Sequence, residues 1–173
     1  MSMPPLEGES EFFEALGRAI AAWQNIEVAL AYLFAAAMPE PKATRSLIVF
    51  DTVQNFRDKL SITDAVLRET LIDAPCLETW NTMLNKLPRL AKRRNRIPHA
   101  HVVQIHVGEK MHLFASPPFS KIPPGAALAD SERRRIFRDS KQLVLVEHAF
   151  KLAAQRLWEL NVTVREELAR REA

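Results

Sequence analysis

The segment "SEFFEALGRAIAAWQNIEVALAYLFAAA", residues 10–37, decides the fold because it has the pattern of one long amphipathic helix. Its inward stripe is predicted by alternating steps of four and three residues, which keep side chains on one face of a helix. The members of this stripe are Leu16, Ile20, Trp23, Glu27, Leu30 and Phe34. We therefore predict a helix capped by Ser10 and ended by "MPEP", with one carboxylate, Glu27, on its apolar face.

Three more helices are predicted after this one. The second covers residues 43–72 and ends at "DAPC", and the third covers residues 77–97 with a kink at Pro88. The fourth covers residues 140–171. Their predicted inward stripes are Val49, Val53, Phe56, Leu60, Leu67 and Leu71; then Leu77, Trp80, Leu84, Leu87 and Ala91; then Leu143, Val146, Phe150, Leu157, Val164 and Leu168.

A β-hairpin is predicted over residues 101–116, "HVVQIHVGEKMHLFAS", because polar and apolar residues alternate around a Gly-Glu pair that suits a two-residue turn. Residues 117–130 hold four prolines and predict an exposed, mobile connector, which a second basic cluster follows. The predicted fold is therefore all-α, a four-to-five-helix bundle with a short β-hairpin between helices 3 and 4. Residues 1–9 are predicted to be a flexible N-terminus and residues 10–173 a single domain.

Composition limits the class of protein. The 173 residues are 47% hydrophobic, which is enough for a real core, and the net charge of +3 is mild. A single cysteine, Cys76, excludes an internal disulfide and a cysteine-based zinc cage. The N-terminus lacks the build of a signal peptide, and no apolar run approaches the roughly 20 residues that cross a bilayer. We expect a cytoplasmic protein with no membrane span.

The third predicted helix ends in a concentration of positive charge. No acidic residue occurs between Glu78 and Glu109. The cations in this interval are Lys86, Arg89, Lys92, Arg93, Arg94 and Arg96. Most of them have two open interpretations. They either form a solvated helix C-terminus, where each cation stabilises by about 0.3 to 1 kcal/mol, or attract phosphate.

Arg94 differs from these neighbours because the helical spacing continues the inward stripe to it. A guanidinium in that position needs a partner, and Glu27 is the predicted one. Pro98 lets the backbone leave the helix, so that His99 can fold back toward Arg94. Such a pair could cleave RNA, because a neutral imidazole can take the proton of a 2′-hydroxyl while arginine holds the developing phosphate charge. This chemistry requires no metal and no cofactor.

The segment "RNRIPHA", residues 94–100, resembles the Arg-x4-6-His motif of the HEPN superfamily, whose members are bundles of four to five helices. Active members of that family are metal-independent endoribonucleases, often toxins, and they dimerise so that two motifs form one composite site. The resemblance implies a homodimer that acts on RNA, with an antitoxin or other partner protein encoded elsewhere. It also implies catalysis by Arg94 and His99, phosphate binding or orientation by Asn95, and Glu27 at the acidic position of helix 1. Lys92 and Arg93 are weaker candidates for RNA binding.

Several alternatives remain open at this stage. Arg96 and His101 form a second pair at the same spacing, and His101 occupies the place of a tyrosine that some HEPN toxins have modified by a partner enzyme. Many HEPN-like proteins also keep the fold without cleaving RNA, so the second functional hypothesis is a non-catalytic interaction or accessory module.

Other histidines and the tryptophans are predicted to have structural roles. A shared strand face would suit His99 and His101 to a metal, but His106 points oppositely, and structural roles are favoured over zinc. The three tryptophans, Trp23, Trp80 and Trp158, are predicted to pack in the core, and His148 is predicted to face solvent.

Overall fold

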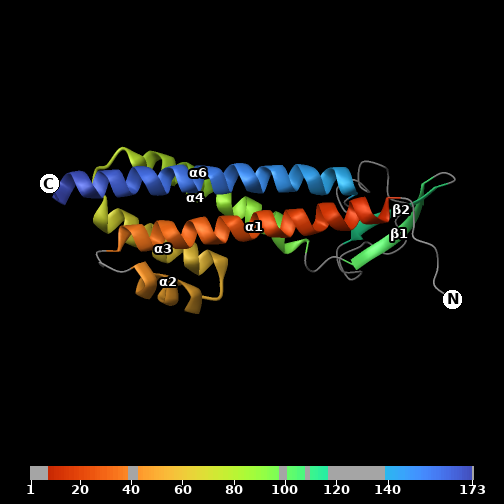
Figure 1. Ribbon diagram of the computed structural model, residues 1–173, viewed down its shortest axis with the longest axis horizontal. Helices are drawn as coiled ribbons and strands as arrows, with labels where there is room; N and C mark the ends of the chain where they lie inside the picture. The colour runs from red at the N-terminus through yellow and green to blue at the C-terminus, as the bar shows by residue number, and fades with distance from the viewer. Residues whose placement is uncertain (1–7, 39–42, 98–100, 108–109, 117–138, 173) are drawn as a thin grey trace. The chain divides into compact units, whose positions relative to one another are not determined.

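The computed structural model describes residues 8–38, 43–97, 101–107, 110–116 and 139–172. Its elements are α1 (Glu9–Ala37), α2 (Ala43–Thr52), α3 (Phe56–Thr70), α4 (Cys76–Asn95), β1 (His101–Val107), β2 (Lys110–Ser116) and α6 (Ser140–Glu172) (Figure 1). The predicted all-α character is confirmed, with one two-stranded antiparallel hairpin in the described residues. The predicted second helix is divided into α2 and α3, so the hairpin follows the fourth helix of the chain, α4, and not the third.

The chain forms two compact units. The first, which we call the hairpin unit, contains Met1–Ala21 and Lys92–His148. The second, which we call the helical unit, contains Ala22–Ala91 and Ala149–Ala173. Each of α1, α4 and α6 contributes one part of its length to each unit.

The start of α1 differs from the prediction. The backbone N–H of Phe12 donates to the Gly8 carbonyl at 3.0 Å, so Ser10 lies inside the first turn and is not the N-cap. Gly8 adopts a φ of +80°, a conformation that glycine reaches without a steric penalty. Glu9 and Glu11 lie in the first turn, where negative charge is favourable beside the positive end of the helix dipole.

The buried face of α1 is built largely from alanine. Trp23, Leu30 and Phe34 are buried as predicted, but Ile20 is 39% exposed and Leu16 is only half-buried. The buried positions include Phe12, Ala15, Ala19, Ala22, Ile26, Ala29 and Leu33. A prediction from large side chains missed this face, because alanine contributes little to an apolar stripe yet lets helices approach closely.

The predicted helix over residues 43–72 is interrupted at Val53–Asn55. Asn55 has extended backbone angles, φ −89° and ψ 131°, and its carbonyl accepts the first hydrogen bond of α3, from Lys59 N at 3.0 Å. Asn55 is therefore the N-cap of α3, although its side chain makes no capping hydrogen bond. Division also changes the inward face, because Phe50 is buried at 1% exposure whereas the predicted member Val49 is 54% exposed.

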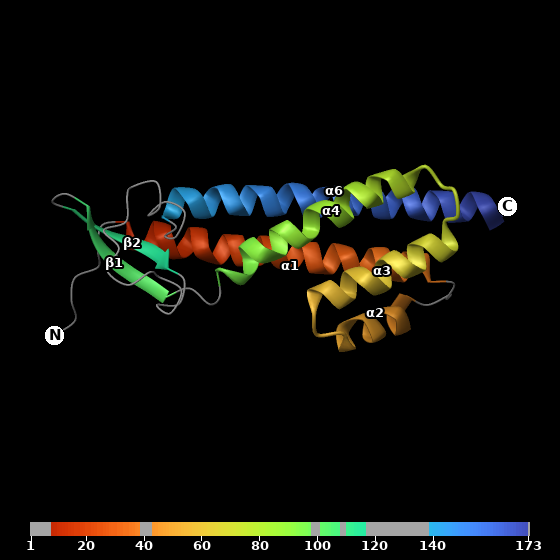
Figure 2. The ribbon, with the colours of Figure 1, turned by 180° about the vertical axis from the view of Figure 1, so that it is seen from behind.

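The third predicted helix is confirmed as α4, which continues through the exposed Pro88. Figure 2, which is turned by 180° from Figure 1, shows α4 facing the viewer. Its buried residues are Cys76, Trp80, Met83, Leu87 and Leu90. Trp80 and Leu87 were predicted, whereas Leu84 and Ala91 are only half-buried. The true face is therefore rotated slightly from the predicted one.

Aromatic side chains join the helices of the helical unit. Trp23 of α1 packs against Phe56 of α3 and Phe150 of α6, with ring centroids 4.7 and 5.3 Å apart. Trp80 of α4 donates its indole N–H to Asp64 Oδ1 of α3 at 2.8 Å. These contacts fix α1, α3, α4 and α6 around one core.

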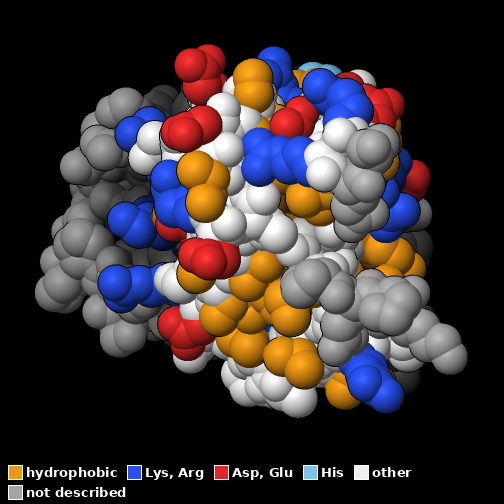
Figure 3. All heavy atoms as spheres, turned by 90° about the vertical axis from the view of Figure 1, so that its left-hand side faces the viewer, with side chains coloured by type: hydrophobic (Ala, Val, Ile, Leu, Met, Phe, Trp, Pro, Cys, Tyr) orange, Lys and Arg blue, Asp and Glu red, His pale blue; other side chains and the backbone are white. Residues whose placement is uncertain are grey.

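The surface of the helical unit keeps several apolar side chains. Trp158 was predicted to be in the core, but it is 40% exposed and packs against Tyr32, with ring centroids 5.4 Å apart. Ile48 and Ile72 are more than half exposed. Figure 3, which views the left-hand side of Figure 1, shows hydrophobic side chains gathered in one area with charged side chains around it.

In the hairpin unit, the strand register confirms the predicted antiparallel pairing, while the turn residues 108–109 lie outside the described residues. Val107 pairs with Lys110, which leaves the predicted two-residue connection. Ala115 belongs to a buried cluster with Phe12, Ala15 and Leu143, and Leu113 packs against that cluster. One face of the hairpin is thereby held by α1 and α6. The predicted connector, residues 117–130, lies outside the described residues.

The last helix is close to its prediction. α6 carries Leu143, Val146, Phe150, Leu157 and Val164 in the core, whereas Leu168 is half-buried. Asp139 begins the helix by accepting the Gln142 N–H at 2.8 Å on its carboxylate.

Only α1, among the described helices, is long and apolar enough to cross a membrane. However, 56% of its most apolar window is buried inside the protein. A core helix of a soluble protein passes the same test of length and composition.

Candidate catalytic site at the end of α4

Arg94 occupies a core-facing position of α4. The buried residues of this helix follow one another at alternating steps of four and three, from Cys76 to Leu90. Continuing this series gives Arg94 and then Ile97, which is 3% exposed. Arg94 is half-buried. A guanidinium therefore stands in a row that is otherwise apolar, where its desolvation is unfavourable unless polar groups compensate it.

Two backbone hydrogen bonds form the turn that ends α4 beside Arg94. The N–H of Ile97 donates to the Arg94 carbonyl at 2.8 Å, and the N–H of Arg96 donates to the Arg93 carbonyl at 3.2 Å. Arg94 Nη1 donates to Asn95 Oδ1 at 3.2 Å, and Asn95 is exposed. The buried Ile97 anchors the point where the chain leaves the helix, so the backbone that carries Arg94 is fixed on both sides.

The two candidate histidines follow this anchor. His99 lies outside the described residues, so its predicted return toward Arg94 stays a prediction. His101 is exposed and begins β1, opposite Ser116. It lies on the strand face opposite to the one that carries Ala115, because neighbouring residues of a strand alternate between faces. His101 is four positions after Ile97 in the chain, which limits their Cα distance to about 14 Å.

Glu27 has a partner on its own helix. It is half-buried and accepts a hydrogen bond from Trp23 Nε1 at 2.9 Å. Glu27 belongs to the helical unit, whereas Arg94 belongs to the hairpin unit. The predicted ion pair of these two residues stays a prediction.

An ion pair that the sequence did not predict lies in the hairpin unit. Glu147 of α6 is 6% exposed and is the one charged side chain that is buried among the described residues. Arg18 of α1 donates from Nε to its Oε2 at 3.2 Å and also pairs with Glu14. The available signal was spacing, because Glu147 lies four residues after the core residue Leu143.

The remaining polar candidates lie on the surface. Lys92, Arg93 and Arg96 are exposed, as is His148, which was predicted to face solvent. No group of three or more His, Cys, Asp and Glu residues in the described ranges is placed to hold a metal ion. Cys76 is buried, and this burial raises the pKa of its thiol.

Comparisons of the chain with protein-family models, with characterised proteins and with solved structures find no significant match.

Proposed function

We propose that this protein is a metal-independent, cytoplasmic endoribonuclease of the HEPN type, active as a homodimer with a composite site. The observation that carries the proposal is the position of Arg94. This half-buried guanidinium stands in the core-facing row of α4, where a charged side chain is unusual, and it donates a hydrogen bond to the exposed amide of Asn95. Residues that break a local folding rule in this way are common at functional sites.

In the proposed reaction, neutral His99 takes the proton from a 2′-hydroxyl of RNA. The resulting oxygen attacks the adjacent phosphorus, the bond to the 5′-oxygen breaks, and a 2′,3′-cyclic phosphate remains on the first fragment. Arg94 binds the phosphate oxygens as negative charge develops, and Asn95 orients them. The leaving 5′-oxygen receives a proton from the histidine of the second copy or from water. DNA lacks the attacking hydroxyl and is left intact.

The test compares purified wild type, His99→Ala and Arg94→Ala on total bacterial RNA in excess EDTA. Wild type should cleave, and both variants should lose cleavage. His148→Ala is the matched control, because His148 is an exposed histidine on α6 that has no part in the proposed site. Mapped ends should carry 2′,3′-cyclic phosphates. Equal cleavage by wild type and His99→Ala would refute the role of His99.

The alternative pair, Arg96 and His101, is tested in the same experiment. Arg96 and His101 are both exposed, so their truncation should leave folding unchanged. If His101→Ala abolishes cleavage and His99→Ala does not, His101 is the base in place of His99. If both variants cleave as wild type does, neither histidine serves as the base.

A non-catalytic interaction module is the second candidate. The observation that favours it is the exposed pair Tyr32 and Trp158, since tyrosine and tryptophan are typical anchors of protein interfaces. Val28 and Val162, each one helical turn away, are also exposed. Absence of RNA cleavage by wild type, with a partner that is lost on Trp158→Ser, would support this function instead.

A further inference from the structure

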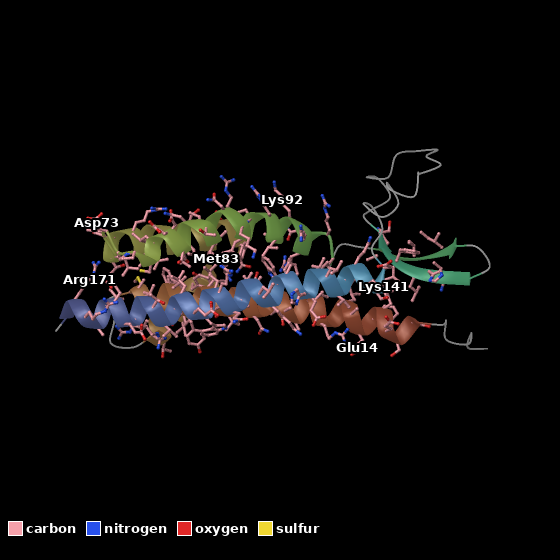
Figure 4. All side chains as sticks on the ribbon, turned by 90° about the horizontal axis from the view of Figure 1, so that it is seen from above. Glu14, Asp73, Met83, Lys92, Lys141 and Arg171 are labelled. Atoms are coloured by element: carbon pink, nitrogen blue, oxygen red, sulfur yellow. The ribbon has the colours of Figure 1, made fainter. Side chains whose placement is uncertain are left out.

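The outer face of α4 is a row of exposed cations. Arg89, Lys92 and Arg93 lie on adjoining parts of one face of α4, and Arg96 follows in the turn directly after the helix, where its N–H donates to the Arg93 carbonyl at 3.2 Å. All four side chains are exposed. Figure 4 shows Lys92 projecting outward from α4, with other nitrogen-tipped side chains beside it.

Carboxylates balance arginines on the other helices but not on this one. Arg18, Arg68 and Arg171 each pair with a glutamate or aspartate four residues away on the same helix. On α4 the last acidic residue is Glu78, and none follows before Glu109. The cations of the outer face therefore have no carboxylate within one helical turn, and their positive potential adds together.

The helix dipole explains only part of this cluster. Its effect falls off within the last turn, which contains Lys92 and Arg93, whereas Arg89 lies before that turn. The dipole therefore does not account for Arg89, and the concentration of positive charge on one side is suited to an anionic partner.

We infer that the outer face of α4, formed by Arg89, Lys92, Arg93 and Arg96, is a docking surface for the phosphodiester backbone of double-stranded RNA. The face is about 10 Å long at 1.5 Å per residue, and a DNA duplex carries one phosphate per about 3.4 Å on each strand, so one strand of a nucleic-acid duplex offers roughly three phosphates over this length. The aromatic residue of α4, Trp80, is buried at 1% exposure, so this face offers no ring for stacking on separated bases. Backbone contact without stacking fits a paired strand and is independent of sequence.

This inference deepens the proposed function and rests on it only for the choice of RNA over DNA. It extends the substrate class to structured RNA, which α4 would hold by its backbone while the residues at the end of the same helix act on an adjacent phosphodiester.

The experiment measures binding of a fluorescein-labelled RNA duplex by anisotropy over a range of salt concentrations. The test variant is Arg89→Gln/Lys92→Gln/Arg93→Gln. The control is Lys141→Gln/Arg156→Gln/Arg165→Gln, which removes the same charge from exposed positions of α6. The affinity of the test variant for the duplex should fall at least about tenfold. The slope of log K against the logarithm of the salt concentration should become shallower by about 2 to 3. The control should stay within about twofold of wild type.

Each other outcome has a defined meaning. Equal loss in both triple variants, or no loss in either, would overturn the inference, as would stronger competition by polyglutamate than by RNA duplex. A DNA duplex bound as tightly as the RNA duplex would overturn the choice of RNA. His99→Ala separates this inference from the proposed function: if wild type does not cleave but both proteins bind through α4, the ribonuclease fails and the docking surface stands.

Discussion

The Arg18–Glu147 ion pair allows a quantitative test of the structure. Glu147 has a side chain only 7% exposed, whereas the side chain of Arg18 is 43% exposed. Breaking a fully buried pair costs about 3 to 5 kcal/mol, and an exposed pair contributes about 0.2 to 1 kcal/mol. Glu147 also keeps another interaction besides Arg18. An intermediate coupling free energy of about 1 to 2 kcal/mol is therefore expected between the two side chains.

The assay is a double-mutant cycle with Arg18→Met, Glu147→Gln and the double variant. Unfolding in urea is followed by circular dichroism, and the coupling is the difference between the double variant and the sum of the single ones. Glu147→Gln should destabilise the protein by about 1 to 3 kcal/mol, because the amide keeps the shape but loses the charged hydrogen bond.

Glu14→Gln serves as the internal control. Glu14 pairs with the same arginine, but its side chain is 62% exposed, so its loss should change the free energy of unfolding by less than about 0.5 kcal/mol. A coupling between Arg18 and Glu147 below about 0.3 kcal/mol would refute the reasoning. So would a larger effect for Glu14→Gln than for Glu147→Gln.

Three other predictions follow from burial and helix geometry. Pro88→Ala should raise the free energy of unfolding by about 1 to 3 kcal/mol in urea titrations, since an exposed proline inside a continuous helix removes a backbone hydrogen bond; a lower free energy would contradict the continuity of α4. Burial raises the pKa of the Cys76 thiol, so the folded state holds this proton more tightly than the unfolded state. That contribution is present at neutral pH and is lost above about pH 8.5, so wild type should lose more stability at alkaline pH than Cys76→Ala. A parallel decline in both proteins would refute this. Trp80→Ala should destabilise by about 3 to 5 kcal/mol and Trp158→Ala by less than about 1.5, and thermal melts that reversed this order would contradict the assigned burial.

The long helices and the hairpin were predictable because their signals are local. The bounds of α1 and α6 lie within about one residue of the prediction, since period and breakers both lie within the segment. The pairing of β1 with β2 was predicted from two alternating segments on either side of one glycine. These features require no knowledge of the rest of the chain.

The errors have a different origin, because they depend on which surfaces meet. Val53–Asn55 interrupts a periodic segment, and the apolar side chains of α2 and α3 then face the core independently. The alanine face of α1 and the exposure of Trp158 depend on how closely neighbouring helices approach. Side-chain size alone could not reveal either.

For the candidate site too, local spacing could be predicted from the sequence, whereas contacts between distant segments could not. Spacing placed Arg94 in the inward row of α4, and the structure finds it half-buried there. Glu147 was missed although it lies four residues after the core residue Leu143, and its partner Arg18, 129 residues away in the chain, could not be found from the periodicity of α6.

Charged side chains in apolar rows oppose folding unless specific partners offset the loss of hydration, so each one needs a separate physical reason. Glu147 has such a reason in Arg18, a contact that joins α6 to α1 within the hairpin unit. Arg94 differs because it lies in the last turn of α4, beside an exposed amide and within a segment that has no acidic residue. Arg18 accounts for the buried charge of Glu147, whereas the proposed contact with phosphate would give Arg94 a role beyond folding. This difference is why the ribonuclease proposal rests on Arg94 and not on the more deeply buried Glu147.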